Sequence, residues 1–289
     1  MNTEVDDSWL YIISSKRKLI NFNFKEIWRY RDLLILFVKR DIVTVYKQTI
    51  LGPLWYVIQP LFTSVIFTLI FNRLGQIQTN GIDPFVFNLA GVTAWNYFKE
   101  CLTGTSNTFT ANQNIFGKVY FPRVILPLSI TISNLLKFGI QLVIFFGFWL
   151  YYYFQGANLS INSSYIWLFP VYIVMMGMLG LGLGMIISSM TTKYRDLTIL
   201  VGFAVQLLMF LSAVPYPVSE AKAKFSEPIA MFVEFNPLTQ IIEGFRYMLL
   251  NTGSFTWLGF FYTLAVCIIS FLLGLLIFNR TEKTFIDTV

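Results

Sequence analysis

Long apolar segments separated by charged connections constrain the fold of this chain more than any other feature. A helix needs about 20 mostly apolar residues to cross the hydrocarbon core of a bilayer. Six segments reach roughly this length: residues 51–71, 85–109, 124–153, 165–190, 197–214 and 257–278. The second segment is interrupted by polar residues, and the fifth is just long enough. We therefore predict an all-α integral membrane protein with six transmembrane helices.

The composition supports a membrane protein and argues against a nucleic-acid partner. Hydrophobic residues make up 56% of the 289 residues and charged residues 12%, which is about half the charged fraction of a soluble domain. The net charge of +6 comes from Lys and Arg residues that mostly flank the apolar segments. Membrane topology explains such a distribution better than binding to DNA or RNA does.

The distribution of Lys and Arg also predicts the orientation of the chain. Most of them lie in the N-terminal segment, in the connections after the second and fourth apolar segments, and in the C-terminal tail. The opposite side has few: Arg73, Lys222, Lys224 and Arg246. The positive-inside rule places both termini in the cytoplasm, and an even number of spans requires the same. The acidic first residues do not resemble a signal peptide, so we expect the first apolar segment to be retained as an anchor.

An amphipathic segment precedes the first span. Residues 24–47 carry apolar side chains at roughly helical spacing, with most of their basic side chains on the other side, as in a helix that lies in the membrane interface. Gly52 and Pro53 mark the corner where the first span begins, because proline is tolerated in the first turn of a helix and disrupts its interior. The alternative is a solvated basic segment beside the membrane. Residues 1–22 would form a cytoplasmic tail.

The region between the fifth and sixth spans, residues 215–256, contains two shorter apolar pieces split by Asn236 and Pro237. Neither piece is long enough to span comfortably. We predict two short re-entrant helices, since irregular backbone at membrane depth needs cover from protein or a cavity. A hairpin lying on the membrane surface is the alternative.

Three ionisable residues lie inside the predicted spans, namely Lys99, Glu100 and Lys137. A charge at the middle of the membrane costs at least about 2.5–3.5 kcal/mol on insertion scales, so such a residue usually faces a partner or water. We predict that Glu100 pairs with Lys137 across the second and third spans. The alternative is that Lys99 and Glu100 lie near an interface and extend toward the headgroups.

Four glycines of the fourth span mark positions of close helix packing. Gly180 and Gly184 have the spacing of small residues at helix interfaces, and Gly177 and Gly182 lie on the same helix. We predict that these glycines pack within the chain. A contact with a second subunit is the alternative.

The residue types exclude several kinds of chemistry. The sequence has no histidine, which removes imidazole bases, Ser–His triads and histidine metal sites. Cys101 and Cys267 do not form a C-x-x-C pair, so we expect no metal or redox role for them. The dipeptide Gly117-Lys118 lacks the upstream glycine of a P-loop. We therefore expect this chain to be no enzyme of these kinds and to bind no cofactor itself; if it is an active pump, its energy comes from a partner or an ion gradient.

Five segments together resemble one transporter family. In chain order they are RYRDLLILFVKRDIVTVYKQTILGPLWYVIQPL (residues 29–61), FPRVILPL (121–128), KYRDL (193–197), VPYPV (214–218) and NPLTQIIEGFRYMLL (236–250). Their order and spacing resemble the permease subunit of the ABC-2 type polysaccharide and polyol phosphate exporters, which include the O-antigen and teichoic acid exporters. The resemblance covers the chain after about residue 22, so residues 23–289 would form one ABC-2 type transmembrane domain.

This resemblance implies partners and a substrate. Two permeases would form a homodimer with two cytoplasmic nucleotide-binding subunits, and those subunits would bind and hydrolyse ATP with Mg²⁺. The substrate would be a glycan linked to undecaprenyl diphosphate, exported across the bacterial inner membrane. Among the polymers we favour O-antigen, with teichoic acid or capsular polysaccharide as alternatives.

The resemblance also implies roles for particular residues. The coupling helix that docks on the ATPase would contain Asn112, Asn114, Phe116, Lys118 and Tyr120. The re-entrant motif would contain Asn236, Pro237, Glu243 and Arg246. We assign to the substrate path a basic collar before the first span, two aromatic residues of the second span and one cation of the third: Arg29, Arg31, Lys39, Arg40, Lys47, Trp95, Tyr97 and Lys137.

The basic collar, residues Arg29, Arg31, Lys39, Arg40 and Lys47, also has a physical rationale. Cations at the cytoplasmic mouth of a channel would attract a lipid-linked diphosphate by charge. The alternative is that these residues bind bulk anionic lipid or only set the topology.

A different class of protein, a membrane-embedded glycosyl- or acyltransferase, is the main alternative. Against it stand the missing histidine and the scattered acids of the opposite side: Asp83, Glu220, Glu227, Glu234 and Glu243. A third alternative is an ABC-2 permease for a drug or a small lipid, which the segment at residues 236–250 disfavours.

Overall fold

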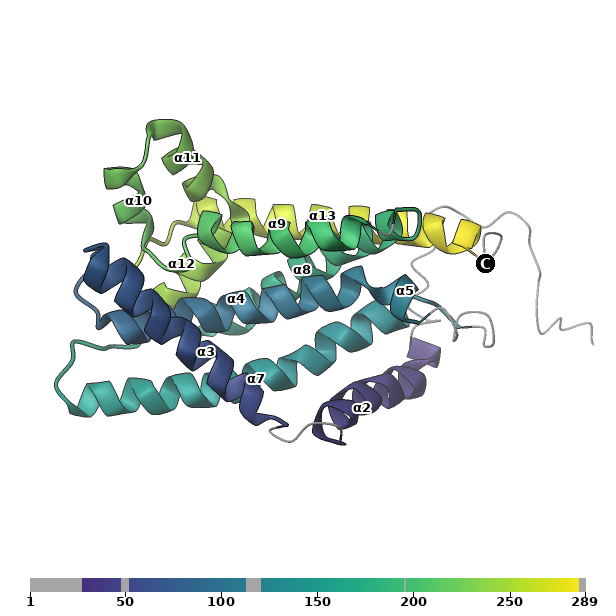
Figure 1. The fold of residues 1–289 in the computed structure, drawn as a ribbon, viewed down its shortest axis with the longest axis horizontal. Helices are drawn as coiled ribbons and strands as arrows, with labels where there is room; N and C mark the ends of the chain where they lie inside the picture. The colour runs from purple at the N-terminus through teal and green to yellow at the C-terminus, as the bar shows by residue number, and fades with distance from the viewer. Residues whose placement is uncertain (1–27, 48–51, 113–120, 195, 286–289) are drawn as a thin grey trace, which may run out of the picture.

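The computed structural model describes residues 28–47, 52–112, 121–194 and 196–285, and these form helices with no strand among them (Figure 1). In chain order the elements are α2 (Arg31–Lys47), α3 (Leu54–Phe67) with its π-helical extension η1 (Thr68–Leu74), α4 (Pro84–Ser106), α5 (Thr108–Ala111), α7 (Ile125–Phe154), the 3-10 turn η2 (Ile166–Leu168), α8 (Phe169–Thr191), α9 (Leu197–Leu211), α10 (Val218–Lys224), α11 (Glu227–Phe235), α12 (Pro237–Leu250) and α13 (Trp257–Phe285). The long helices run along the longest axis of the molecule.

Among the described residues, four helices are long and apolar enough to cross a membrane: Leu54–Leu74, Ile125–Phe154, Ile166–Thr191 and Trp257–Thr281. The helix α9 is apolar but has only 15 residues, and α4 has 23 residues with polar and charged side chains among them. The protein is therefore a multi-pass membrane protein. Each of the six predicted segments is helical, with ends that differ from the predicted ones by a few residues.

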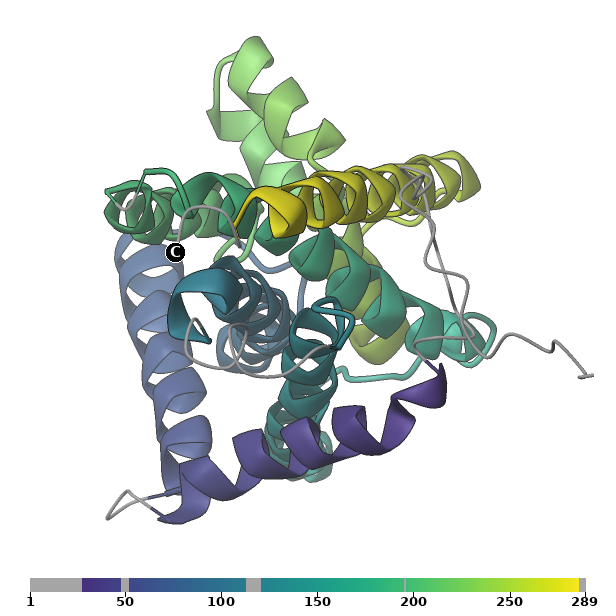
Figure 2. The same cartoon turned by 90° about the vertical axis from the view of Figure 1, so that its right-hand side faces the viewer.

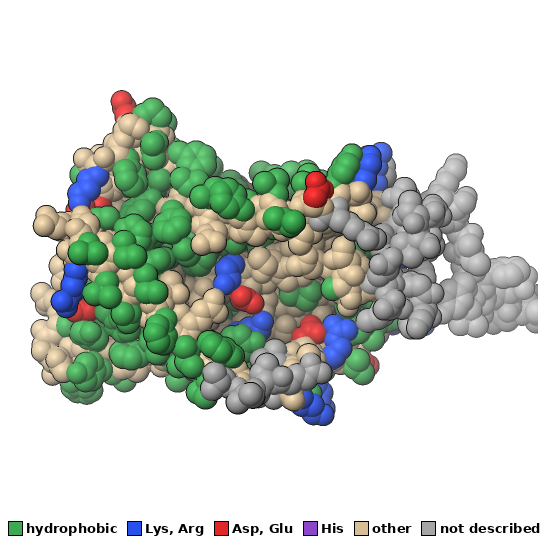
Figure 3. Space-filling model, viewed as in Figure 1, with side chains coloured by type: hydrophobic (Ala, Val, Ile, Leu, Met, Phe, Trp, Pro, Cys, Tyr) green, Lys and Arg blue, Asp and Glu red, His purple; other side chains and the backbone are tan. Residues whose placement is uncertain are grey.

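The outer faces of these helices expose large apolar side chains. Leu258 of α13 is 86% exposed and Ile199 of α9 is 81% exposed, and Phe62 of α3 is also largely exposed. Hydrophobic side chains cover much of the face shown in Figure 3. Soluble monomers rarely expose apolar surface this extensive, so these faces are suited to contact with lipid.

The helix α4 is the centre of the bundle. It packs against α3, α7, α8 and α12, and its residues Val86–Phe98 are buried without interruption. Its polar side chains therefore meet other helices instead of lipid. The amide nitrogen of Asn88, for example, donates to Asn72 Oδ1 at 2.8 Å and to Thr68 Oγ1 at 3.1 Å in the η1 extension of α3.

The glycines of α8 allow α4 and α13 to approach its backbone. A Cβ atom on Gly180 would come 2.8 Å from Cβ of Cys101, and one on Gly184 would come 2.6 Å from Cβ of Thr105, both on α4. A Cβ atom on Gly182 would come 2.7 Å from the backbone of Ser270 on α13. The prediction that these glycines pack within the chain is confirmed.

The region between α9 and α13 forms three helices, α10, α11 and α12, and the last two coincide with the two apolar pieces of the sequence. The helix α11 ends at Phe235 and α12 begins at Pro237, with the side chain of Asn236 accepting a hydrogen bond from the N–H of Leu238 at 3.0 Å. This is an N-cap followed by proline in the first turn, a favourable start for a helix. The helix α12 packs into the bundle against α4, α8 and α13, whereas α10 and α11 project from it (Figure 1).

The helix α2 lies across one end of the bundle. Figure 2 shows it running crosswise to the long helices, below the ends of α5 and α7. Its Phe37 is buried and belongs to a cluster with Phe121, Ile125 and Phe278. The predicted interface helix covers residues 24–47, of which residues 24–27 lie outside the described part of the chain. After residues 48–51, also outside that part, Gly52 and Pro53 lead into α3 at Leu54, as the sequence predicts.

Candidate functional site

An ionic cluster lies between α4 and α7, formed by Lys99, Glu100 and Lys137. The ammonium group of Lys137 lies 3.4 Å from Oε2 of Glu100, and the ammonium group of Lys99 lies 3.6 Å from Oε1 of the same carboxylate. The predicted pair of Glu100 with Lys137 is therefore confirmed. The sequence predicts no partner for Lys99; in the structure its ammonium group lies near the carboxylate of the adjacent Glu100.

This ionic cluster lines a small polar pocket. Residues from α3, α4 and α7 form its walls: Tyr56, Gln59, Asn96, Tyr97, Lys99, Glu100, Asn134, Lys137, Phe138 and Gln141. It has about 30 Å³ of space accessible to water, two to three times the roughly 10–15 Å³ that one water molecule needs. The charged side chains are partly open, with 22% of Lys137 and 37% of Glu100 exposed. Charged side chains are visible within a hollow of the face in Figure 3.

Uncharged groups orient the cluster. Lys137 Nζ lies 5.3 Å from the centre of the Tyr56 ring, a distance at which a cation is attracted to the aromatic face. Asn96 donates to Gln141 Oε1 at 3.5 Å, the long limit of a hydrogen bond, so both amides keep hydrogen-bonding capacity.

The two aromatic residues assigned to the substrate path are both buried on α4. Tyr97 lines the pocket, with its ring 5.0 Å from that of Phe138. Trp95 packs on Phe98 with ring centres 5.5 Å apart, and it is not among the residues that line the pocket. Their positions fit helix packing as well as a role in transport.

Several pocket residues were missed in the sequence, although a pattern could have identified them. Asn134, Lys137 and Gln141 are spaced three and four residues apart on α7, and Asn96 lies four residues before Glu100 on α4. Such spacing puts side chains on one face of a helix. A row of polar side chains along each of two apolar helices indicates that these two faces contact one another. This signal is weaker than that of a charged side chain in an apolar segment.

A double-mutant experiment tests the coupling of Glu100 with Lys137. We expect Glu100→Gln and Lys137→Met each to lower the stability of the folded protein, since the first leaves two ammonium groups without a carboxylate and the second leaves Glu100 with Lys99 alone. The double variant should lose less than the sum of the two single losses, with a coupling free energy of about 0.5–3 kcal/mol. The measurement is thermal unfolding of the full chain in lipid nanodiscs. Strictly additive losses would contradict the coupling.

A second cluster surrounds Arg246 of α12. This side chain is 0% exposed. Its Nη1 donates to Glu243 Oε1 at 3.2 Å and to the carbonyl oxygen of Ala213 at 2.9 Å, and its Nη2 donates to the carbonyl oxygen of Val214. The guanidinium carbon lies 3.7 Å from the centre of the Phe87 ring on α4. The buried charge is thus paired, hydrogen-bonded and stacked on an aromatic ring.

The contacts of Arg246 join two segments that resemble the exporter family, VPYPV and NPLTQIIEGFRYMLL. Asn236 adds a second link, because its amide donates to the carbonyl oxygen of Leu211 and to Ser212 Oγ, both at 3.1 Å. Burial raises the pKa of Tyr216 in this connection to about 12, and the protonated hydroxyl donates to the carbonyl oxygen of Phe210. Asn236 and Pro237 thus mark the start of α12, whereas Glu243 and Arg246 lie within it, with Arg246 against the connection that follows α9.

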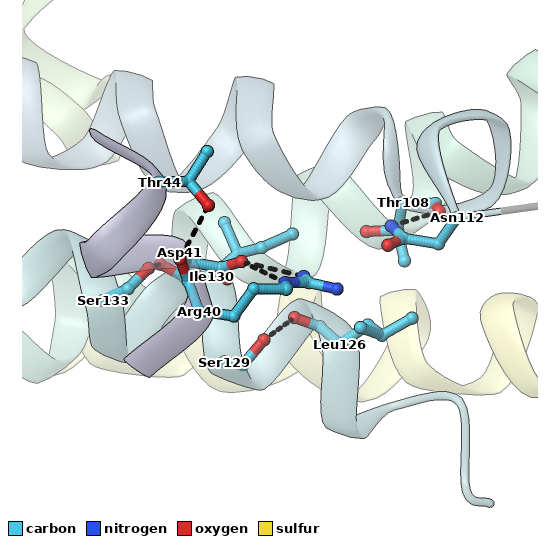
Figure 4. Close-up of polar contacts among 9 residues, drawn as sticks. All are labelled: Arg40, Asp41, Thr44, Thr108, Asn112, Leu126, Ser129, Ile130 and Ser133. Carbon is cyan, nitrogen blue, oxygen red and sulfur yellow. Dashed lines mark hydrogen bonds and ion pairs between the residues drawn. The ribbon is translucent and has the colours of Figure 1, made fainter. Parts of the chain in front are cut away.

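The predicted basic collar lies along α2, with Arg29 just before its first residue. Arg29, Arg31, Lys39 and Lys47 are exposed, whereas Arg40 is half-buried. Arg40 donates to Oδ1 of Asp41 at 2.8–2.9 Å and stacks on Phe37, and Figure 4 shows it next to Leu126 and Ser129 of α7.

The predicted coupling segment is described only at its start. The amide of Asn112 donates to the carbonyl oxygen of Thr108, which closes the last turn of α5 (Figure 4). Asn114, Phe116, Lys118 and Tyr120 lie outside the described residues. The helix α5 packs on α8, at the end of the bundle where α2 lies.

Comparison with known proteins identifies the family. A model of the ABC-2 type transporter family matches residues 32–250. An O-antigen export system permease protein RfbA from Klebsiella pneumoniae is 27% identical over 257 residues, which cover 89% of this chain and 94% of the relative. One from Myxococcus xanthus is 24% identical over 228 residues, which cover 77% and 82%. The matched residues include nearly all of α2, the ionic cluster and the Arg246 cluster. The chain therefore belongs to the ABC-2 type transporter family.

Proposed function

We propose that this chain is the membrane permease of an ATP-driven exporter that moves a lipid-linked polysaccharide out of the cytoplasm, with O-antigen as the polymer. The observation that carries the proposal is the similarity to permeases named for O-antigen export over 89% of this chain, within a transporter family. The helical bundle with a polar pocket inside it is compatible with this role. Polar and ionisable residues inside membrane helices generally belong to transport paths or to helix contacts.

The proposed topology has six spans with both termini on the cytoplasmic side of the bacterial inner membrane. In this arrangement α4 and α9 join the four longer helices as spans. The central, covered position of α4 supports its inclusion, because polar residues are tolerated where other helices surround them. The helices α11 and α12 would be re-entrant from the outer side, and the docking of α12 between helices of the bundle supports this.

The proposed assembly is a homodimer of permeases with two ATPase subunits, which would supply the sites for ATP and Mg²⁺. The coupling segment Asn112–Tyr120 would dock on the ATPase, next to α2 and at the cytoplasmic end of the bundle. The basic collar on α2 would meet the diphosphate of the substrate there, since four of its five cations are exposed.

Co-purification with an ATPase encoded beside this chain tests the proposal. We expect a stable complex whose ATP hydrolysis in nanodiscs changes when a lipid-linked glycan is added. Lys118→Gln, in the coupling segment, should reduce both association and the response to glycan several-fold. Lys222→Gln is the matched control, because Lys222 is on α10 at the other end of the bundle and should have no effect.

Failure to associate with any ATPase would contradict the export function. Turnover of a sugar or acyl donor by the purified chain alone would favour a membrane-embedded transferase instead. A panel of lipid-linked polymers distinguishes O-antigen from teichoic acid and capsular polysaccharide, because only the transported class should alter hydrolysis.

A further inference from the structure

We propose that the ionic cluster of Lys99, Glu100 and Lys137 is a binding site for the phosphate oxygens of a lipid-linked diphosphate. The inference rests on the proposed export function and assigns to the pocket between α3, α4 and α7 one part of the substrate, its charged linkage between lipid and glycan. The charge balance of the cluster, its geometry and its depth along the helices support this assignment.

The charge of the cluster is not balanced. Two ammonium groups share one carboxylate, and Glu100 is the one acidic residue among the described residues that line the pocket. One positive charge is therefore in excess within a bundle of apolar helices. The three charged side chains are only 22–37% exposed, so water compensates the excess charge incompletely and the pocket favours the arrival of an anion.

The ion pairs of the cluster are loose. Their N···O distances are 3.4 and 3.6 Å, whereas the pairs Lys222–Glu234 and Lys224–Glu220 at the end of the bundle measure 2.7 and 3.0 Å. Charge-assisted hydrogen bonds are usually about 2.7–2.9 Å long. Each ammonium group has three N–H donors, so both lysines retain donors for a second acceptor. An ion pair that served only to hold α4 and α7 together would stabilise their contact more at a shorter N···O distance.

The walls of the pocket supply further groups for an oxyanion. The amides of Asn96, Asn134 and Gln141 and the hydroxyl of Tyr56 all belong to lining residues, and each side chain can donate hydrogen bonds. Water-accessible space in the pocket is small, so the phosphate group would have to displace the lysine side chains outward or rearrange them. Lysine is suited to this movement because its four-carbon stem is flexible.

The position of the pocket suits a phosphate attached to a lipid. Glu100 lies six residues before the end of α4 at Ser106, and Gln59 lies five residues after the start of α3 at Leu54. The end of α4 lies at the end of the bundle where α2 is found. At 1.5 Å per residue Glu100 is roughly 9 Å from that end of α4, whereas Lys137, twelve residues after the start of α7 at Ile125, is roughly 18 Å from the start of its helix. The cluster therefore lies between the headgroup region and the middle of a 30 Å core.

Binding of farnesyl diphosphate by the full chain in phosphatidylcholine nanodiscs tests the proposal without the ATPase. We expect saturable binding that Lys99→Met and Lys137→Met each weaken about tenfold, the value of one charge-assisted hydrogen bond. Glu100→Gln should bind at least as tightly as the wild type, because it increases the excess of positive charge. Lys222→Met is the control and should bind normally.

The opposite behaviour of Glu100→Gln and Lys137→Met separates a binding site from a structural ion pair, which both changes would weaken alike. Equal weakening by both variants in folded protein would overturn the proposal. So would binding of farnesol as tight as that of the diphosphate, or equal competition by phosphatidylglycerol at the same mole fraction. Competition by inorganic pyrophosphate would support recognition of the phosphate group itself.

Failure of this site and failure of the proposed export function give different results. Absence of diphosphate binding, together with an ATPase complex that responds to glycan, would remove this site and leave the export function intact. Binding at the cluster with no ATPase partner would support the site and contradict the exporter.

Discussion

Replacing Arg246 with methionine is expected to cost about 3–5 kcal/mol of folding free energy, enough to abolish accumulation of folded protein in many membrane proteins. The substitution leaves the carboxylate of Glu243 buried without a counter-charge. It also removes the donor from the carbonyl oxygens of Ala213 and Val214, which lie in the connection after α9. The measurement is the unfolding midpoint in detergent, with size-exclusion yield as a second readout.

The effect of Glu243→Gln should be smaller, about 1–3 kcal/mol, because Arg246 keeps its carbonyl acceptors and its stacking on Phe87. Arg246→Lys should resemble Arg246→Met more than the wild type, since a lysine cannot reach several acceptors with one planar group. Equal losses for Arg246→Met and Glu243→Gln would show that the ion pair alone matters and that the carbonyl contacts contribute nothing.

Adding a single methyl group at Gly182 is the second change with a large expected effect. A Cβ atom there would lie 2.7 Å from the backbone nitrogen of Phe271 and from the backbone carbon and oxygen of Ser270. Backbone atoms cannot turn aside as a side chain can, so α8 and α13 must separate along their contact. We expect Gly182→Ala to lose about 1–3 kcal/mol and Gly182→Leu to lose more.

Gly139 of α7 is the matched control for this experiment. It is also a glycine inside a long helix, but a Cβ atom there would meet no heavy atom within 4 Å. Gly139→Ala should therefore be neutral or stabilising by up to about 1 kcal/mol, the difference in helix propensity. Thermal unfolding of both variants gives the comparison. A loss at Gly139 as large as that at Gly182 would mean that helix flexibility, rather than close packing, explains the result.

The helices were largely predictable because each depends on residues close together in the sequence. Runs of apolar residues gave the long helices, and Asn236 with Pro237 marked the break between α11 and α12. The sequence did not predict that other helices surround α4. Its polar residues made it the weakest predicted span, whereas in the fold they are buried against α3, α7, α8 and α12. Burial of this kind depends on residues distant in the sequence.

The candidate sites divide in the same way. Glu100 and Lys137 were paired from sequence because opposite charges in apolar segments need partners. The partners of Arg246 were not predictable, because they are backbone carbonyl oxygens. Every residue has one, so the sequence of side chains does not indicate which of them accepts the hydrogen bond. Gly91 of α4 carries a weak signal, since a Cβ atom there would lie 2.8 Å from the carbonyl oxygen of Val214. One glycine in an apolar helix does not say which neighbour requires it.

The cover that other helices give to α4 has a consequence for the order in which the chain enters the membrane during synthesis. Segments released singly into lipid must be apolar enough to remain there, and a helix with Asn88, Asn96, Lys99 and Glu100 gains little from lipid contact. Of the helices that cover α4, only α3 is made before it, and α7, α8 and α12 follow. We therefore expect α4 to stay at the translocation machinery, paired with α3, until α7 and α8 have been made and can enclose it.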